Sequence, residues 1–166
     1  MPYLGHLLGT VALVLEDGGT EPEAIAALLH DAVEDGTPEM AATIRDRFGD
    51  TVAAIVEGCT DPDIEGTFRE IKEEHIRRLE SGSSSVRRVA LAEKLDNARA
   101  LVRDLERFGG DTWKRMDVDR REMLWYFESL VALFRRSFPS VLVNEFARAV
   151  GRIGELSRTC EETTDA

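Results

Sequence analysis

The sequence is poor in cysteine and in basic residues, and each shortage excludes a class of function. Its 166 residues include two cysteines, Cys59 and Cys160, which lie far apart and belong to no CxxC or Cys–His pattern. Neither a disulfide framework nor a zinc ribbon is therefore supported. Only 21 Lys and Arg stand against 32 Asp and Glu, which gives a formal net charge of −11. Such a chain has no basic surplus with which to bind nucleic acid or an anionic membrane.

Long hydrophobic runs are absent as well. The most apolar stretch, from Tyr3 to Leu15, is too short to span a bilayer and is interrupted by His6 and Thr10. No basic segment precedes this stretch and no small-residue cleavage site follows it, so it does not resemble a signal peptide. We therefore expect a cytoplasmic protein.

The composition that remains, 43% hydrophobic and 32% charged residues, is typical of one globular domain with a core. Apolar residues recur at helical spacing almost throughout, and alternation of period two is hard to find. The sequence predicts an all-α fold, a bundle of about seven to eight helices over residues 1–158, followed by a frayed polar tail at 159–166.

Glycine, proline and capping residues mark the breaks between the expected helices. Thr20 and Glu23 form a capping-box pattern at the start of the second helix, and Gly49 separates two later ones. His75, in a highly charged helix, is expected to face solvent. The expected helices cover about 4–16, 20–34, 37–48, 50–59, 67–81, 86–108, 111–138 and 141–156.

The most informative run is AALLHDAVED at residues 26–35, in which an apolar helix suddenly presents four polar residues: His30, Asp31, Glu34 and Asp35. In a continuous helix these residues form one polar edge, because residues four apart lie above one another. Adjacent His and Asp can offer an imidazole and a carboxylate to one Mn²⁺, Fe²⁺ or Zn²⁺ ion. The alternative is a solvated helix end, although acidic residues there oppose the helix macrodipole.

Two further positions bear on this interpretation. His6 lies among leucines of the first expected helix and faces inward, either as a satisfied core residue or as a ligand. In residues 89–101 four polar residues interrupt an apolar segment: Glu93, Lys94, Asp96 and Asn97. Charges in such a segment need partners or a metal ion. Alternatively, Lys94 and Asp96 are exposed while Glu93 pairs with a basic neighbour.

Five segments, in this order, resemble the HD-domain metal-dependent phosphohydrolases: PYLGHLL, AIAALLHDAVED, FGDTVAAIVEGCTD, KLDNARAL and LWYF. They are most similar to the small guanosine-tetraphosphate (ppGpp) pyrophosphohydrolases related to the hydrolase half of RelA/SpoT proteins, over about residues 2–135. The resemblance implies an all-helical fold that binds one Mn²⁺, or another divalent cation. It also implies hydrolysis of the 3′-pyrophosphate of ppGpp or a similar small phosphorylated nucleotide. It does not indicate an oligomeric state.

The resemblance assigns the metal ligands by position: His6, His30, Asp31 and Glu93. It further implies that Glu34 and Asp35 orient a water molecule and take its proton, and that Asn97 contacts the nucleotide. Relatives also keep a lysine where this chain has Lys72, which either holds a phosphate or is a solvated surface residue. Arg99 reaches either the substrate pocket or a nearby acid.

The chain departs from this family pattern in two places. Relatives read A-D-K-L-H-N-A-R where residues 92–99 read A-E-K-L-D-N-A-R. Glu93 is one methylene longer than aspartate, so comparable coordination requires the metal or the helix to shift. Asp96 replaces a histidine and adds negative charge to the pocket. Relatives also carry a helix and a basic loop ahead of the Pro-Tyr-x-x-His segment, whereas here Pro2 is the second residue; either the loop is absent or the true start lies upstream.

Two alternatives to ppGpp hydrolysis stay open at this point. A related HD phosphohydrolase could act on NADPH or a nucleoside monophosphate, because the His-Asp pair supplies the metal site and not the base pocket. A degenerate protein with weak or no catalysis could keep the fold and bind a nucleotide. Glu93, Asp96 and the absent basic loop favour this second alternative, whereas the complete His-Asp and Glu-Asp pairs oppose it.

Overall fold

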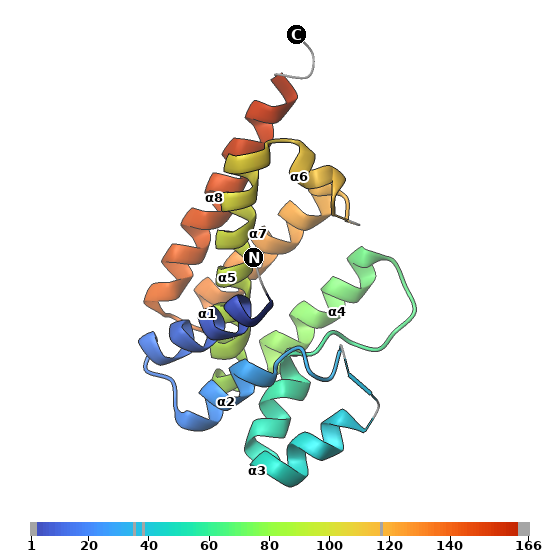
Figure 1. The fold of residues 1–166 in the computed structure, drawn as a ribbon, viewed down its shortest axis with the longest axis vertical. Coiled ribbons are helices and arrows are strands. Elements are labelled where there is room, and N and C mark those ends of the chain that lie inside the picture. Colours follow the sequence, from blue (N-terminus) through green and yellow to red (C-terminus); the bar gives the residue numbers. More distant parts are fainter. Residues whose placement is uncertain (1–2, 35, 38, 117, 163–166) are drawn as a thin grey trace.

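A computed structural model describes residues 3–34, 36–37, 39–116 and 118–162, and these residues form helices joined by turns and loops, with no strand among them (Figure 1). The all-α prediction is therefore confirmed. The helices are α1 (Tyr3–Glu16), α2 (Glu21–Leu29), α3 (Met40–Cys59), α4 (Phe68–Ser81), α5 (Ser84–Phe108), α6 (Asp111–Lys114), α7 (Arg120–Ser137) and α8 (Val141–Glu162).

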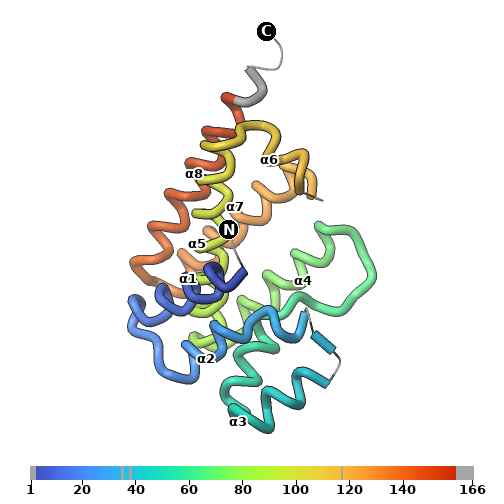
Figure 2. The backbone as a smooth tube through the Cα atoms, viewed as in Figure 1, coloured from blue at the N-terminus to red at the C-terminus, as the bar shows by residue number. Residues whose placement is uncertain are grey.

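Helix α5 is the centre of the fold. It runs alongside α8, while α1 to α4 gather around its N-terminal half (Figure 2). The side chains of Leu91 and Leu95 on α5 are fully buried, as are Phe134 on α7 and Phe146 and Ile153 on α8. This burial of large apolar side chains is the main stabilising contribution to the fold. It also fixes the polar residues of α5 relative to α1 and α2.

Helix α2 begins as predicted but ends earlier. The Glu23 carboxylate accepts hydrogen bonds from the backbone N–H (2.6 Å) and the hydroxyl (2.8 Å) of Thr20, as in a capping box. The helix stops at Leu29, and residues 30–34 form turns, so the prediction of a helix to residue 34 is wrong. Nδ1 of His30 hydrogen-bonds to the carbonyl oxygen of Ala27 (2.8 Å). In a continuing helix this oxygen would accept from the N–H of Asp31 instead.

The predicted break at Gly49 is present, because this residue has φ 85° and ψ 170° inside α3, a conformation that only glycine adopts easily. The expected single helix over 111–138 is wrong. It divides into α6 and α7, because the Asp119 carboxylate caps a new helix by accepting from the N–H groups of Arg121 (2.7 Å) and Glu122 (3.4 Å).

Helix α8 continues to Glu162, which places the first half of the predicted frayed tail in a helix. Residues 163–166 lie outside the described residues. The division into one domain over 1–158 stays a prediction. No helix in the described ranges is both long and apolar enough to cross a membrane.

Candidate metal centre

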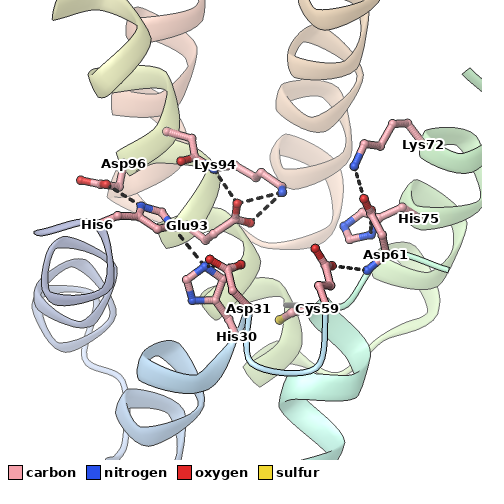
Figure 3. Close-up of polar contacts among 12 residues, drawn as sticks. His6, His30, Asp31, Cys59, Asp61, Lys72, His75, Glu93, Lys94 and Asp96 are labelled. Atoms are coloured by element: carbon pink, nitrogen blue, oxygen red, sulfur yellow. Dashed lines mark hydrogen bonds and ion pairs between the residues drawn. The ribbon is translucent and has the colours of Figure 1, made fainter. Parts of the chain in front are cut away.

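Two histidines face each other where α1 and the end of α2 meet. Their Nε2 atoms are 3.2 Å apart, with His6 contributed by α1 and His30 by the turn after α2 (Figure 3). Nδ1 of His6 lies 2.8 Å from a carboxylate oxygen of Asp96, and Nδ1 of His30 lies 2.8 Å from the carbonyl of Ala27. Both partners are acceptors, so in the neutral form of either ring the proton is on Nδ1. Each Nε2 is then left with a lone pair.

Asp31 adds a carboxylate to this pair of lone pairs. Its Oδ1 lies 3.0 Å from Nε2 of His30. One ligand atom from each of His6, His30 and Asp31 lies within 4.8 Å of the other two. We call these three residues the metal centre. Two facing lone pairs repel unless a proton or a cation lies between them, and two nitrogens each about 2.1 Å from one ion are about 3.0–3.4 Å apart. The donor set therefore fits a divalent cation.

Electrostatic shifts at the metal centre also favour a cation. Burial lowers the pKa of His30, but the hydrogen bond that Nε2 of the protonated ring donates to Asp31, with the charges of Glu93 and Asp31, outweighs burial and raises that pKa above its ordinary value. Burial raises the pKa of Asp31, but the hydrogen bond and the charge of His30 lower it on balance. The negative potential that favours a proton on His30 also favours a metal ion at the same lone pair.

Glu93, the fourth predicted ligand, lies beside the metal centre without belonging to the group of three. Its carboxylate accepts from Nζ of Lys94 (2.8 Å) and from Nδ2 of Asn97 (2.6 Å) (Figure 3). Burial lowers the pKa of Lys94, but the Glu93 carboxylate outweighs it and holds that pKa well above its usual range. The alternative that Lys94 and Asp96 are exposed is wrong, since their side chains are 14% and 10% exposed. The pairing of Glu93 with a basic neighbour is correct.

Of the predicted water-activating pair, Glu34 is exposed at the end of the turn after α2. Its Oε1 accepts from the backbone N–H of Asp61 (2.6 Å), which ties the turn to the loop before α4. One carboxylate oxygen of Glu34 is thus held and the side chain stays open to solvent. Asp35 lies outside the described residues.

A second polar cluster, the lysine cluster, consists of Asp61, Lys72, His75 and Lys94. The carboxylate of Asp61 contacts Nζ of Lys72 and, at 2.9 Å, Nδ1 of His75. The two ammonium groups lie 5.1 and 5.7 Å from the ring centre of Tyr126. Although burial raises the pKa of Asp61, its contacts with His75 and Lys72 hold that pKa far below its ordinary value. Lys72 is therefore neither a free surface residue nor part of the metal centre.

His75 is 1% exposed, so the prediction that it faces solvent is wrong. Burial and the charge of Lys94 lower its pKa, and the hydrogen bond to Asp61 does not make up the difference. Sequence reasoning missed Asp61 and His75 because the contact joins a loop to α4, and residues 14 positions apart share no helical face. The only sequence signal was the Thr60-Asp61-Pro62 turn, which indicates a turn and not a partner.

Asn97 connects Glu93, which lies beside the metal centre, to a pocket of about 350 Å³ between α5, α6 and α7. Its side chain donates to Glu93 and also lines the pocket, whose wall includes Phe127 and the basic residue Arg115. Arg99, two residues after Asn97 on α5, contacts the carboxylate of Glu145 on α8 instead. The structure therefore brings Asn97, but not Arg99, into contact with Glu93.

The HD domain family matches residues 1–118. The zebrafish (Danio rerio) protein named guanosine-3′,5′-bis(diphosphate) 3′-pyrophosphohydrolase MESH1 is 36% identical over 129 residues, 76% of this chain and 66% of its own length. An Aquifex aeolicus protein named guanosine-3′,5′-bis(diphosphate) 3′-pyrophosphohydrolase is 38% identical over 104 residues, 60% of this chain and 14% of its own. The chain thus spans just under two thirds of the zebrafish relative and a small part of the bacterial one.

Two solved structures share this fold. The crystal structure of lmo0812 from Listeria monocytogenes EGD-e has a TM-score of 0.78 and 29% identity, and the match covers 87% of this chain and 96% of that protein. A metazoan ortholog of SpoT, described as hydrolysing ppGpp, has a TM-score of 0.65 and 24% identity, with coverage of 96% and 82%. The latter likeness concerns the fold alone. With a family match over more than half of its length, the chain belongs to the HD domain family.

Proposed function

We propose that this protein is a metal-dependent phosphohydrolase that removes the 3′-pyrophosphate of ppGpp. The observation that carries the proposal is the arrangement of His6 and His30, whose Nε2 lone pairs face each other at 3.2 Å beside the Asp31 carboxylate. The similarity to proteins named ppGpp 3′-pyrophosphohydrolases supports the choice of substrate. Because those relatives are hydrolases, a degenerate binding protein is not favoured.

His6, His30 and Asp31 would hold the divalent cation, for which Mn²⁺ is our choice. When bound, such a cation neutralises phosphate charge and lowers the pKa of water. Glu34 is exposed at the end of the turn that begins with His30 and Asp31, with one oxygen held by the N–H of Asp61. We assign Glu34, together with Asp35, to orient the attacking water and take its proton, a role that suits a positioned carboxylate. Water adds to the phosphorus that is attached to the ribose 3′-oxygen. The bond between this phosphorus and the 3′-oxygen breaks, pyrophosphate leaves, and the 3′-oxygen takes a proton.

The pocket beside Asn97 is our site for the nucleoside. Its volume of about 350 Å³ lies within the range of about 300–1,000 Å³ that ligand pockets occupy. Because the Asn97 side chain contacts Glu93, a nucleoside in this pocket would place its phosphates toward the metal centre. Arg115 lines the pocket and is the better candidate for a substrate contact than Arg99. Lys72 would have to exchange Asp61 for a phosphate.

The formal net charge of −11 agrees with a small-molecule substrate rather than nucleic acid. A cytoplasmic location stays a prediction.

The test is pyrophosphate release from ppGpp by the purified protein, with Mn²⁺ and after chelation. Hydrolysis of NADPH and of GMP is measured separately as the alternative. We expect release from ppGpp that depends on Mn²⁺. Metal analysis of the same sample should find about one equivalent of a divalent metal. A folded, Mn²⁺-loaded protein that releases no pyrophosphate would overturn the proposal, and hydrolysis of NADPH or GMP alone would move it to another nucleotide.

A further inference from the structure

Asp96 is a residue of α5 that the resemblance does not explain, because relatives carry a histidine at its position. It is buried, and its Oδ2 lies 2.8 Å from Nδ1 of His6 (Figure 3). Nδ1 and Nε2 of an imidazole point to opposite sides of the ring, and Nε2 of His6 faces His30. Asp96 therefore lies on the side of the His6 ring that faces away from His30, and it affects the Nε2 lone pair through the ring.

Gly9 makes the room that Asp96 occupies. It lies on α1 three residues after His6, on the same face of the helix. A Cβ at this position would be 2.6 Å from Oδ1 and 3.1 Å from Cγ of Asp96, closer than side chains pack. Glycine is among the least favourable residues in a helix interior, so its presence here needs a reason. The close approach of the Asp96 carboxylate to α1 supplies one.

We propose that Asp96, in the space left by Gly9, is a positioning residue of the metal centre. Its carboxylate accepts a hydrogen bond from Nδ1–H, which fixes the tautomer of His6. The Nε2 lone pair then points toward His30, where the metal ion would bind. The carbonyl of Ala27 does the same for His30. This inference rests on the metal site of the proposed function, and it concerns binding of the ion rather than the identity of the nucleotide.

The two histidines are held by different kinds of hydrogen-bond acceptor, a side-chain carboxylate at His6 and a backbone carbonyl at His30. A backbone carbonyl cannot be replaced by substitution, whereas the support of His6 is a side chain from another helix, 90 positions along the sequence. A carboxylate also makes the ring it supports a better ligand than a carbonyl does. Asp96 thereby links α5 to the ligand on α1, so the packing of these two helices sets the geometry of the metal centre.

Asp96→Asn is the first test, because the amide has nearly the same shape but can donate a hydrogen bond to Nδ1. Donation moves the ring proton to Nε2 and blocks the lone pair, as happens when the aspartate of a serine-protease triad becomes asparagine. We expect Mn²⁺ affinity, measured by calorimetry without nucleotide, to fall about 10- to 100-fold. Glu106→Gln, which also replaces a carboxylate by an amide but on the exposed face of α5, should leave Mn²⁺ affinity unchanged.

Gly9→Ala tests the same point without altering the carboxylate. The clash falls on the end of a flexible side chain, so the Asp96 carboxylate moves while α1 stays folded. We expect Mn²⁺ affinity to fall by at least about tenfold. Gly151→Ala on α8, where a Cβ would meet nothing within 4 Å, is the matched control and should bind Mn²⁺ as the unaltered protein does.

Nitrogen NMR of the His6 ring in the metal-free protein provides a readout that does not depend on metal binding. We expect the proton on Nδ1 in the unaltered protein and a shift toward Nε2 in Asp96→Asn. A proton on Nε2 in the unaltered protein, or full Mn²⁺ affinity in both variants, overturns the inference. An unaltered protein that has the expected tautomer but binds no divalent metal instead overturns the metal site of the proposed function.

Discussion

The two histidines buried most deeply, His30 in the metal centre and His75 in the lysine cluster, are 4% and 1% exposed, yet their pKa values shift in opposite directions. Burial alone lowers both. At His30 the Asp31 carboxylate and the charge of Glu93 outweigh burial, whereas at His75 the charge of Lys94 adds to it. Burial therefore does not separate the proposed ligand His30 from His75, whereas the charge around each ring does.

The same difference separates the two clusters as wholes. In the lysine cluster the Asp61 carboxylate contacts Lys72 and His75, and each lysine neutralises a neighbouring acid. The metal centre consists of one acid and two imidazoles, and the ion pair that the structure describes for Asp31 is with His30 rather than with a lysine or arginine. A cluster that is neutralised internally holds helices together, and a cluster with excess negative charge attracts a cation. Glu93 lies on the boundary, because it affects His30 while it pairs with Lys94.

The largest expected effect comes from exchanging the two histidines for alanine, one at a time. His30→Ala removes a ligand and should weaken Mn²⁺ binding by more than the roughly 100-fold that loss of a ligand's hydrogen-bond partner costs. His75→Ala should keep Mn²⁺ affinity but destabilise the fold by about 2–4 kcal/mol, because it leaves a cavity and uncovers Asp61. Calorimetry with Mn²⁺ and urea unfolding measure the two effects. Equal losses of affinity in both variants would contradict the distinction between the clusters.

Lys94→Met examines the boundary between the clusters. The variant leaves the Glu93 carboxylate with Asn97 but without its ammonium partner, and breaking a buried ion pair from one side costs about 3–5 kcal/mol. Mn²⁺ should restore more stability to this variant than to the unaltered protein, because the unpaired carboxylate lies beside His30. Urea unfolding with and without Mn²⁺ measures this difference.

Lys114→Met is the control for that experiment, since Lys114 is 80% exposed and pairs with Asp111 on the surface. It should change stability by less than about 1 kcal/mol. If Lys94→Met is no more destabilising than this control, Glu93 does not depend on Lys94.

The opposite pKa shifts predict opposite pH dependences of stability in the metal-free protein. His75 has a folded-state pKa below 6.5, so the unfolded chain binds more protons and the contribution of His75 is lost as pH falls below about 6.5. His30 has a raised folded-state pKa, so its contribution is present below about 6.5 and is lost as pH rises through the folded-state value. His75→Gln should therefore reduce the loss of stability between about pH 7 and pH 5 by up to about 1.4 kcal/mol per pH unit. Urea unfolding across this range is the measurement, and an unchanged slope would show that His75 does not titrate as its surroundings indicate.

Much of the fold was predictable because its signals are local. The capping box at Thr20 and Glu23 and the glycine break at Gly49 follow from neighbouring residues, and both are present. The end of α2 was not predictable, because it depends on a hydrogen bond between the His30 ring and the carbonyl of Ala27, which helix propensities do not describe. The break before α7 was missed because Asp119 lies in a charged stretch that is compatible with a helix.

The candidate site divides along the same line between local and distant contacts. His30 and Asp31 stand out because they are adjacent and polar in an apolar run. The contact between Asp96 and His6 joins α5 to α1 and depends on how these helices pack. The partner of Arg99 is likewise a residue of another helix, which the sequence left open between the pocket and a nearby acid.

Arg99→Ala is expected to have the smallest effect. The side chains of Arg99 and of its partner Glu145 are 40% and 30% exposed, and ion pairs of this kind contribute about 0.2–1 kcal/mol. The variant should keep its Mn²⁺ affinity and its rate of pyrophosphate release. Arg115→Ala, in the pocket beside Asn97, should instead raise the KM for ppGpp while leaving Mn²⁺ binding unchanged. A rise in KM for Arg99→Ala alone would show that Arg99 leaves Glu145 when substrate binds, and would place a substrate contact on the α8 side of α5 rather than in the pocket.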